Sequence, residues 1–515
     1  MIFRTFIIGF VLLFATPASP ITNPSAFREI NSLLDFWDIE QSEKLLQVLQ
    51  TQNSNNDNLA LLESRLEFMR GYYEKAWSLA KNIKPRQTHW HHFKTLLKNT
   101  RKITKSFVMR ESEHFQFYFI DGPDEILVHY ASEVLEKSYS ILGKIFNYYP
   151  KEKIRVEFYP SRETFSKISP LNIDDIITSG TVALCKYNRI MAISPASLYR
   201  GYNLMDTLSH EYVHYLLTRK SQNTVPLWLH EGLAKYFETR WRQSKETLTP
   251  IMETALARGL ADKYLIGLDE MMPSFAKLKN AEDVQLAYAE VASMVDYMVT
   301  LKDETIFVKM IDYLAKGVKF EFALESLFGT SLAQFQNNWK ISAHKKNYKE
   351  IPGLKTLKFR FKDSRKENKD KKETGSISSK KARDFTFLGD ILKSRNHPDA
   401  AAIEYTKAIN TNETLSPIIY NKLASTLMKV RKYTEAESLL HKSLNYYPMF
   451  HTTLINLGEL YYQMDKMDKS TNYFERAIRL NPFNPFAHIR LIALYKLLNF
   501  KEEQEVQSRL FKLLE

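Results

Sequence analysis

Apolar residues recur every three or four positions in the first hundred residues, which is the spacing of one helical face. Leu61, Leu62, Leu66 and Met69 are one example of this pattern. We therefore expect residues 27–100 to form a helical cap on the domain that follows.

The pattern changes after Ser112 to short segments rich in aromatic and β-branched residues. Residues 114–120 end at an Asp-Gly-Pro turn, and apolar residues alternate over 154–158 after a long helical stretch. Two more short strands are expected at residues 181–184 and 190–193. These segments predict a small mixed sheet within an α+β domain.

Helical spacing returns further along the chain. The expected helices cover residues 246–260, 282–301, 304–314, 320–327 and 331–343.

Between the sheet and these helices stands an H-E-x-x-H pentapeptide that contains His210, Glu211 and His214. On a helix the two histidines lie one turn apart on the same face, so both imidazoles can reach one metal ion. Glu211 projects beside them as a base. A catalytic zinc ion needs a third protein ligand and leaves a fourth position for water.

A second predicted helix offers that ligand. It opens at Pro226 and carries Glu231 in an early turn. The small residues Gly232 and Ala234 stand beside Glu231 and would let this helix approach the first one closely.

The two segments, H-E-Y-V-H and P-L-W-L-H-E-G-L-A-K-Y-F, resemble those of the glutamate-zincin metallopeptidases, in particular the peptidase-MA-like group. The resemblance implies a zincin-like α+β fold over residues 112–345 and one Zn²⁺ per chain. It implies His210, His214 and Glu231 as the metal ligands and Glu211 as the catalytic base.

The same resemblance suggests further roles. Thermolysin-type members have an aspartate four residues after the ligand glutamate, whereas this chain has Lys235, so the partner that orients His210 is unassigned. Tyr288 stands where the family often has a tyrosine that stabilises the oxyanion. A strand before the zinc helix commonly pairs with an extended substrate, and residues 190–193 are the candidates for that sheet edge.

Other potential ligands have simpler interpretations. His230 is expected at the rim or surface of its helix, and Cys185 as a small apolar filler near the strand turn. The cluster of His89, His91 and His92 is interpreted as a solvated helix end in preference to a second metal site.

Residues 350–383 are crowded with Lys and Arg and have almost no apolar periodicity after Phe361. Such a composition predicts a flexible basic linker. A role in binding nucleic acid or an anionic membrane is the alternative, but no stacking aromatics are interleaved among the charges, so a solubilising tether is favoured.

Residues 384–515 repeat with a period of about 34 residues, which is typical of tetratricopeptide (TPR) repeats. The recurring positions are Gly389, Ala424 and Gly458; Ala408, Ser443 and Ala477; and Pro448 and Pro482. Small residues suit close helix crossings, and the resulting α-solenoid should present a groove for a peptide or partner protein. One pair within residues 27–100 also resembles a degenerate TPR repeat, about as well as it fits a plain helical cap.

Residues 1–19 combine an early Arg4, an apolar run and small residues, as in a secretory signal peptide. We therefore expect an exported protein in the periplasm or cell envelope. An uncleaved N-terminal anchor, which would keep the protein near a membrane, is the alternative. Cys185 is the only cysteine, so no intramolecular disulfide can form.

These patterns predict an exported zinc metallopeptidase that hydrolyses proteins or peptides and recruits a substrate or partner through its TPR module. The alternative is a catalytically silent envelope scaffold that acts through the repeats. Hydrolysis of a non-peptide amide or ester would use the same water-activating residues and also stays open. The net charge of +13 is dispersed and does not favour a nucleic-acid partner.

Overall fold

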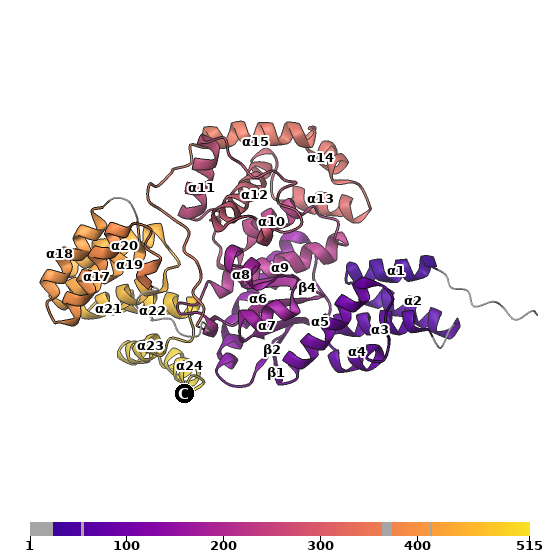
Figure 1. Cartoon of the computed structure of the whole chain (residues 1–515), viewed down its shortest axis with the longest axis horizontal. Coiled ribbons are helices and arrows are strands. Elements are labelled where there is room, and N and C mark those ends of the chain that lie inside the picture. Colours follow the sequence, from indigo (N-terminus) through magenta and orange to yellow (C-terminus); the bar gives the residue numbers. More distant parts are fainter. Residues whose placement is uncertain (1–23, 53–55, 363–372, 412–414) are drawn as a thin grey trace, which may run out of the picture. The chain divides into compact units, whose positions relative to one another are not determined.

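The computed structural model describes residues 24–52, 56–362, 373–411 and 415–515. The predicted signal peptide, residues 1–19, lies outside the described residues. The chain divides into two compact units, one ending at Arg86 and one beginning at Gln87 (Figure 1).

The described residues of the first unit form four helices, as the apolar spacing predicted. They are α1 (Pro24–Asp35), α2 (Ile39–Gln52), α3 (Asp57–Arg70) and α4 (Tyr73–Ala80). Gly71 ends α3 in the left-handed conformation with φ of 83°, and Ser64 donates a hydrogen bond to the carbonyl of Ala76 across the α3–α4 pair. The next helix, α5 (Thr88–Thr104), belongs to the second unit, so the cap is shorter than the predicted 27–100.

The second unit contains the mixed sheet. Its strands are β1 (Phe107–Glu111), β2 (Phe115–Ile120), β3 (Ile154–Tyr159), β4 (Ala183–Lys186) and β5 (Arg189–Ile193), in the spatial order β1-β2-β3-β5-β4. The three inner strands are parallel, and β1 and β4 are antiparallel to their neighbours. The α+β class is confirmed. Strand β1 was not predicted, because its sequence Phe-Val-Met-Arg-Glu has no alternation of apolar residues.

The prediction of the sheet edge at residues 190–193 is wrong. Strand β5 lies between β3 and β4, and all five of its residues are buried. Strand β4, which the turn at Tyr187 and Asn188 joins to β5, forms the edge. A strand that is apolar at successive positions is typical of the inside of a sheet, so the composition of β5 already favoured the interior.

The helices between and after the strands build the rest of the domain (Figure 1). Those around the sheet are α6 (Ile126–Phe146), α7 (Arg162–Ile168), α8 (Ile173–Ser179), α9 (Leu204–Ser221) and α10 (Leu227–Phe237). The following ones are α11 (Pro250–Ala261), α12 (Ala281–Leu301), α13 (Ile306–Ala315), α14 (Phe320–Phe328) and α15 (Leu332–Lys346). Trp339 on α15 is buried and donates a hydrogen bond of 3.0 Å to Ser293 on α12, which fixes the last helix of the domain.

The range predicted as a flexible linker, residues 350–383, is partly structured. Phe361 forms a β-bridge with Leu198, and the amide of Lys362 donates a hydrogen bond of 2.7 Å to the carbonyl of Ser197. Helix α17 (Lys380–Ser394) begins inside the predicted linker. The structure differs from the prediction here because the buried side chains of Leu354 and Phe361 anchor the segment despite its many cations. Residues 363–372 lie outside the described residues.

The repeat module is an array of helix pairs, as the 34-residue period predicted. Its helices are α17, α18 (Pro398–Ile409), α19 (Pro417–Lys429), α20 (Tyr433–Tyr446), α21 (His451–Gln463), α22 (Met467–Leu480), α23 (Pro485–Leu497) and α24 (Lys501–Lys512). A Cβ atom on Gly389 would come within 2.6 Å of the Tyr405 ring, and one on Gly458 within 2.9 Å of the Phe474 ring. The recurring glycines therefore permit the close crossing within a pair.

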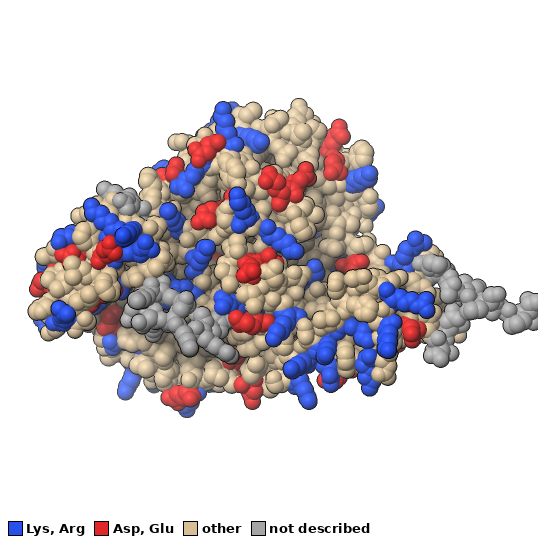
Figure 2. All heavy atoms as spheres, viewed as in Figure 1, with Lys and Arg blue, Asp and Glu red and all other residues tan. Residues whose placement is uncertain are grey.

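Lys and Arg side chains are spread over the visible face with Asp and Glu side chains among them (Figure 2). Among the described helices, none has both the length and the apolar character needed to span a bilayer.

Candidate metal centre

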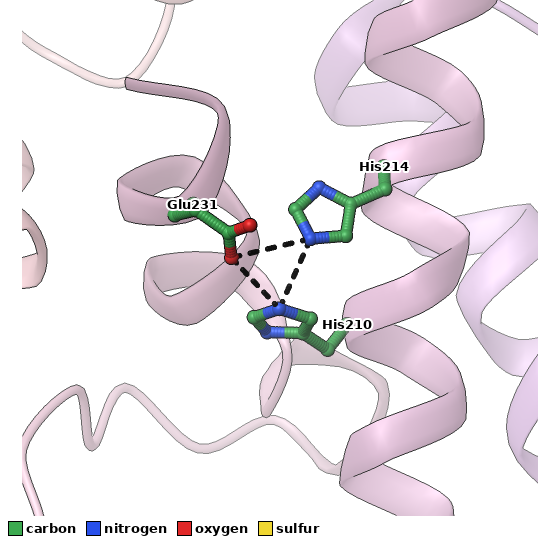
Figure 3. Close-up of side chains that lie close together, drawn as sticks. All are labelled: His210, His214 and Glu231. Carbon is green, nitrogen blue, oxygen red and sulfur yellow. Dashed lines mark hydrogen bonds and ion pairs between the residues drawn. The ribbon is translucent and has the colours of Figure 1, made fainter. Parts of the chain in front are cut away.

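Helix α9 carries the H-E-x-x-H segment. Its N-terminus is capped by Asn203, whose side chain accepts a hydrogen bond from the amide of Asp206. The helix is buried on nearly all sides, and this holds the backbone of His210 and His214 in place. The two imidazoles project from successive turns toward α10 (Figure 3).

Helix α10 presents Glu231 to these imidazoles (Figure 3). A Cβ atom on Gly232 would lie 2.9 Å from the carbonyl oxygen of Val291 on α12. The glycine therefore permits close packing of α10 on α12. The sequence had suggested that it permits close packing on α9, because it stands next to Glu231. This packing matters for the site because α12 carries Tyr288.

The three predicted ligands converge on one point. The two Nε2 atoms lie 3.1 Å apart, and Glu231 Oε2 lies 3.5 Å from His210 Nε2 and 3.4 Å from His214 Nε2. Tetrahedral zinc with bonds of roughly 2.0–2.1 Å places its ligand atoms about 3.4 Å apart. The buried Oε2 atom of Glu231 has no hydrogen-bond partner among the described residues. Both the spacing and the two-nitrogen, one-oxygen donor set fit zinc.

The charges in the site are strongly coupled. Burial acts to raise the pKa of Glu231, but the imidazoles of His214 and His210 hold that pKa far below its ordinary value. Burial acts to lower the pKa of His210, yet Glu231 and Glu238 raise it to about 10. The pocket thus stabilises positive charge at the point where the three ligand atoms meet.

Glu211 lies beside the ligands at the sheet edge. Burial raises the pKa of its carboxyl group, and the two histidines and the backbone amide of Cys185 on β4 act against that rise. With His210 and Tyr288, Glu211 lines a cavity of about 290 Å³. Part of the cavity wall is the segment that leads into β4, which includes Thr181 and Val182.

The orienting partners of the histidines were not found from the sequence. Glu238 Oε2 lies 3.0 Å from His210 Nδ1, and Lys235 lies 2.5 Å from the other oxygen of Glu238. Glu238 is seven residues after Glu231, so the two carboxylates share one face of α10, two turns apart. That spacing is the sequence signal that could have identified it.

His214 has a different partner. His230 Nδ1 lies 2.6 Å from His214 Nδ1, and the two rings stack with centroids 4.6 Å apart. His230, expected at the rim or surface, is partly exposed, and like Glu231 it contacts a histidine of α9. Burial and the charge of His214 lower the pKa of His230 to about 3, so His230 is neutral and one ring carries the shared proton.

Tyr288 on α12 lies beside the three ligands. Its ring centroid is 6.3 Å from that of His210 and 5.0 Å from that of Phe275. Burial and the nearby carboxylates of Glu231 and Glu211 raise the pKa of the phenol well above its ordinary value. The hydroxyl therefore keeps its proton and can act as a hydrogen-bond donor, and its catalytic role stays a prediction.

The other candidate ligands lie apart from this centre. His89, His91 and His92 are exposed on α5, in agreement with a solvated helix end. Cys185 on β4 is half-buried next to Glu211. Glu113, His114 and Glu136 also lie close together, but Glu136 already accepts hydrogen bonds from Ser112 and from the backbone and ring of His114.

Comparison with known protein families finds two matching regions in the chain. Residues 173–345 match the Peptidase MA superfamily, and residues 390–515 match the N-terminal TPR repeats region of Psidin. The chain carries a Peptidase MA superfamily domain followed by TPR repeats. The Peptidase MA match includes every predicted ligand, Glu211 and Tyr288. No curated protein matches the chain.

Several solved structures are similar at low identity. The structure from a study of Pseudomonas aeruginosa pilF is 23% identical with a TM-score of 0.25, covering 28% of this chain and 67% of that chain. A thermophilic TPR protein of Thermus thermophilus, TTC0263, is 21% identical with a TM-score of 0.24, covering 26% and 74%. Native yeast LTA4 hydrolase is 13% identical with a TM-score of 0.31, covering 79% and 66%. We draw no functional conclusion from similarities of this size.

Proposed function

We propose that the protein is an exported zinc metallopeptidase whose TPR module takes part in binding its protein or peptide substrate. The observation that carries this proposal is the convergence of His210, His214 and Glu231, whose ligand atoms lie 3.1–3.5 Å apart. That spacing matches a tetrahedral zinc site without any rearrangement of the helices.

A zinc ion held by these residues would activate a water molecule and polarise the scissile carbonyl. Glu211 takes the proton of the attacking water and passes it to the leaving nitrogen. The raised pKa of Glu211 suits a group that must both accept and donate a proton. The protonated hydroxyl of Tyr288 donates to the oxygen that becomes negative as the carbonyl is attacked.

An extended substrate would pair with the exposed edge of β4. One edge of β4 pairs with β5, and its other edge ends the sheet beside Glu211. A peptide strand added there would extend the sheet and lie across the metal centre.

The proposed site of action is the periplasm or cell envelope, on the strength of the signal-like sequence of residues 1–19. If that segment is retained, it would keep the enzyme close to a membrane. We propose protein and peptide partners and no nucleic acid, because the net charge of +13 is dispersed along the chain.

Elemental analysis of the purified full chain tests the metal centre. We expect about one zinc per wild-type chain, and loss of that zinc in His214→Ala and Glu231→Ala. The exposed His91 offers a matched control, and His91→Ala should keep its zinc. Absence of metal from the wild type after zinc is supplied would contradict the proposal.

A peptide library then tests the activity. The zinc-loaded wild type should cleave peptides, whereas Glu211→Gln should bind zinc and leave them intact. A wild-type protein that holds zinc and cleaves no peptide would favour the scaffold, or hydrolysis of a different amide or ester.

A further inference from the structure

A second cavity continues the one at the metal centre. The cavity of about 610 Å³ shares Thr207, Lys235 and Glu238 with the cavity that contains His210 and Glu211. Its opposite wall belongs to the repeat module and consists of Leu444, Asn445, Pro448 and Met449, at the end of α20 and the turn that follows. The space beside the metal centre is therefore bounded by the repeats.

The repeats are held firmly against the peptidase domain at this place. Leu354, Ile418, Tyr447 and Phe450 form a buried apolar cluster to which Ile251 of α11 contributes. The hydroxyl of Tyr447 donates to the carbonyls of Lys355 and Leu415, at 3.0 and 2.9 Å. A module anchored in this way forms a fixed wall of the cavity.

A second contact fixes the repeats near the start of α9. A Cβ atom on Gly201 would lie 2.4 Å from the carbonyl oxygen of Leu480, at the end of α22. Arg200 forms an ion pair of 2.6 Å with Glu373, and its guanidinium lies over the ring of Phe450. The helix that carries the metal ligands is thus held directly by the repeat module.

The charge of the second cavity is negative, in contrast to the chain as a whole. Four carboxylates and two cations line it, namely Asp206, Glu238, Glu246 and Glu253 with Lys235 and Arg242. Both cations already pair with carboxylates, Lys235 with Glu238 and Arg242 with Asp206. In the described part of the chain, no ion pair joins Glu246 or Glu253 to a cation.

The position of Asn203 on α9 indicates how far the second cavity extends from the metal centre. Asn203 lines it and lies seven residues before His210 on α9, which is about 10 Å along the helix. An extended polypeptide rises about 3.3 Å per residue, so this length corresponds to about three residues of substrate. Met449, with 45% of its surface exposed, offers an apolar contact in the same space.

We infer that α20 and the turn after it complete the substrate cleft, which takes an extended polypeptide carrying a basic residue about three positions from the cleaved bond. This inference rests on the proposed function and names its substrate class. The repeat module is then a part of the cleft that selects the substrate, rather than a separate recruiting arm.

Binding to the inactive chain tests this inference without requiring turnover. The probes are fluorescent extended peptides with Lys, Ala or Glu two to four residues from a fixed central bond, on either side, added to zinc-loaded full-length Glu211→Gln. We expect Lys at one of these positions to lower Kd about tenfold relative to Glu. The inference would be overturned if no peptide position shows a preference for Lys. It would also be overturned if that preference stays the same after the carboxylates of Glu246 and Glu253 are replaced.

Two matched pairs of variants locate the effect. Adding Glu246→Gln and Glu253→Gln should reduce the preference for Lys to about twofold or less, because the uncompensated carboxylates are removed. Glu321→Gln with Glu325→Gln, two exposed residues of α14, should leave it unchanged. The substitution Met449→Ser should weaken the binding of all the peptides alike. The control Leu497→Ser, at an exposed position on α23, should weaken the binding of none.

The outcomes separate this inference from the proposed function. A wild type that cleaves no peptide, combined with charge-selective binding to Glu211→Gln, would refute the peptidase activity and keep the cleft. Peptide cleavage with no effect of the Glu246, Glu253 and Met449 substitutions on binding would keep the activity and refute the cleft. Failure of Glu211→Gln to bind any peptide would refute the cleft as well.

Discussion

Two helix pairs of this molecule pack closely for different purposes. In the repeat pair α21–α22, Gly458 faces Phe474, and both sides of the crossing are apolar. In the pair α9–α10, the facing residues are His210, His214 and Glu231, whose polar atoms meet in a buried space. Apolar contact stabilises the first pair by itself, whereas the second pair brings buried charged groups together, and these groups need one another or a metal ion as partners. Substitutions should therefore affect stability in one region and chemistry in the other.

The largest effect should come from the base, which does not contact the metal. Glu211→Gln removes the proton acceptor and keeps the shape of the side chain, so we expect hydrolysis to fall by about 10²–10⁴-fold. Zinc content and thermal unfolding should match the wild type. Steady-state hydrolysis, elemental analysis and thermal unfolding of the same preparation measure these three properties. Loss of zinc in this variant would place Glu211 among the ligands.

Tyr288→Phe should have the next largest effect. Removing the hydroxyl deprives the developing oxyanion of one donor, which costs about 10²-fold in kcat at comparable sites. Because the hydroxyl acts in the transition state, KM and zinc content should change little. Unchanged kcat would show that Tyr288 is an ordinary packing residue, held between Phe275 and His210.

Glu238→Gln should weaken the metal site without destroying it. The carboxylate of Glu238 accepts from His210 Nδ1 and fixes which nitrogen faces the metal. Loss of such a partner typically costs about 10–100-fold in metal affinity. Competition with a chromogenic zinc chelator measures this. Glu321→Gln, on the exposed face of α14, is the matched control, and equal affinity in both variants would exclude an orienting role for Glu238.

A substitution in the repeats should lower the stability of the protein and leave the metal centre unchanged. Gly458→Val would force methyl groups against the Phe474 ring, where a Cβ atom alone would be 2.9 Å away. Overpacking of this kind costs roughly 1–3 kcal/mol. Denaturant unfolding followed by circular dichroism should show an earlier transition, while the zinc content at low denaturant stays that of the wild type. Equal unfolding of the two proteins would show that the crossing can widen.

The metal centre could be predicted in part because its ligands are close together in sequence. The four-residue interval places His210 and His214 on one helical face, and the family resemblance pointed to Glu231 on the next helix. Glu238 and His230 were missed because their roles depend on the angle at which α10 meets α9, and local spacing does not determine that angle. The sequence did contain the seven-residue interval from Glu231 to Glu238.

The errors elsewhere also concern tertiary contacts. The mixed sheet and the helix pairs followed from apolar spacing. The sheet edge was assigned to residues 190–193 from the family resemblance, although the successive apolar residues of β5 already favoured the interior of the sheet. The linker prediction weighed the cations of residues 350–383 above Phe361, which is buried and forms a β-bridge with Leu198. Composition describes a segment by itself, whereas its structure here comes from the domain on which it packs.

The smallest effect should be a difference in pH dependence between two buried histidines, one from each region. In the metal-free protein the pKa of His210 is raised to about 10, so its contribution to stability is full below pH 6.5 and is lost as the pH rises through 10. Burial lowers the pKa of His451 in the repeats to about 4, so its contribution is full above pH 6.5 and is lost as the pH falls through 4.

Thermal unfolding between pH 4 and 10 should therefore show a loss of stability at both ends of this range. Zinc replaces the proton of His210, so zinc-loaded protein should lose the alkaline change and keep the acidic one. The variant His451→Gln should lose the acidic change and keep the alkaline one. An alkaline change that persists with zinc bound would show that His210 is not a ligand.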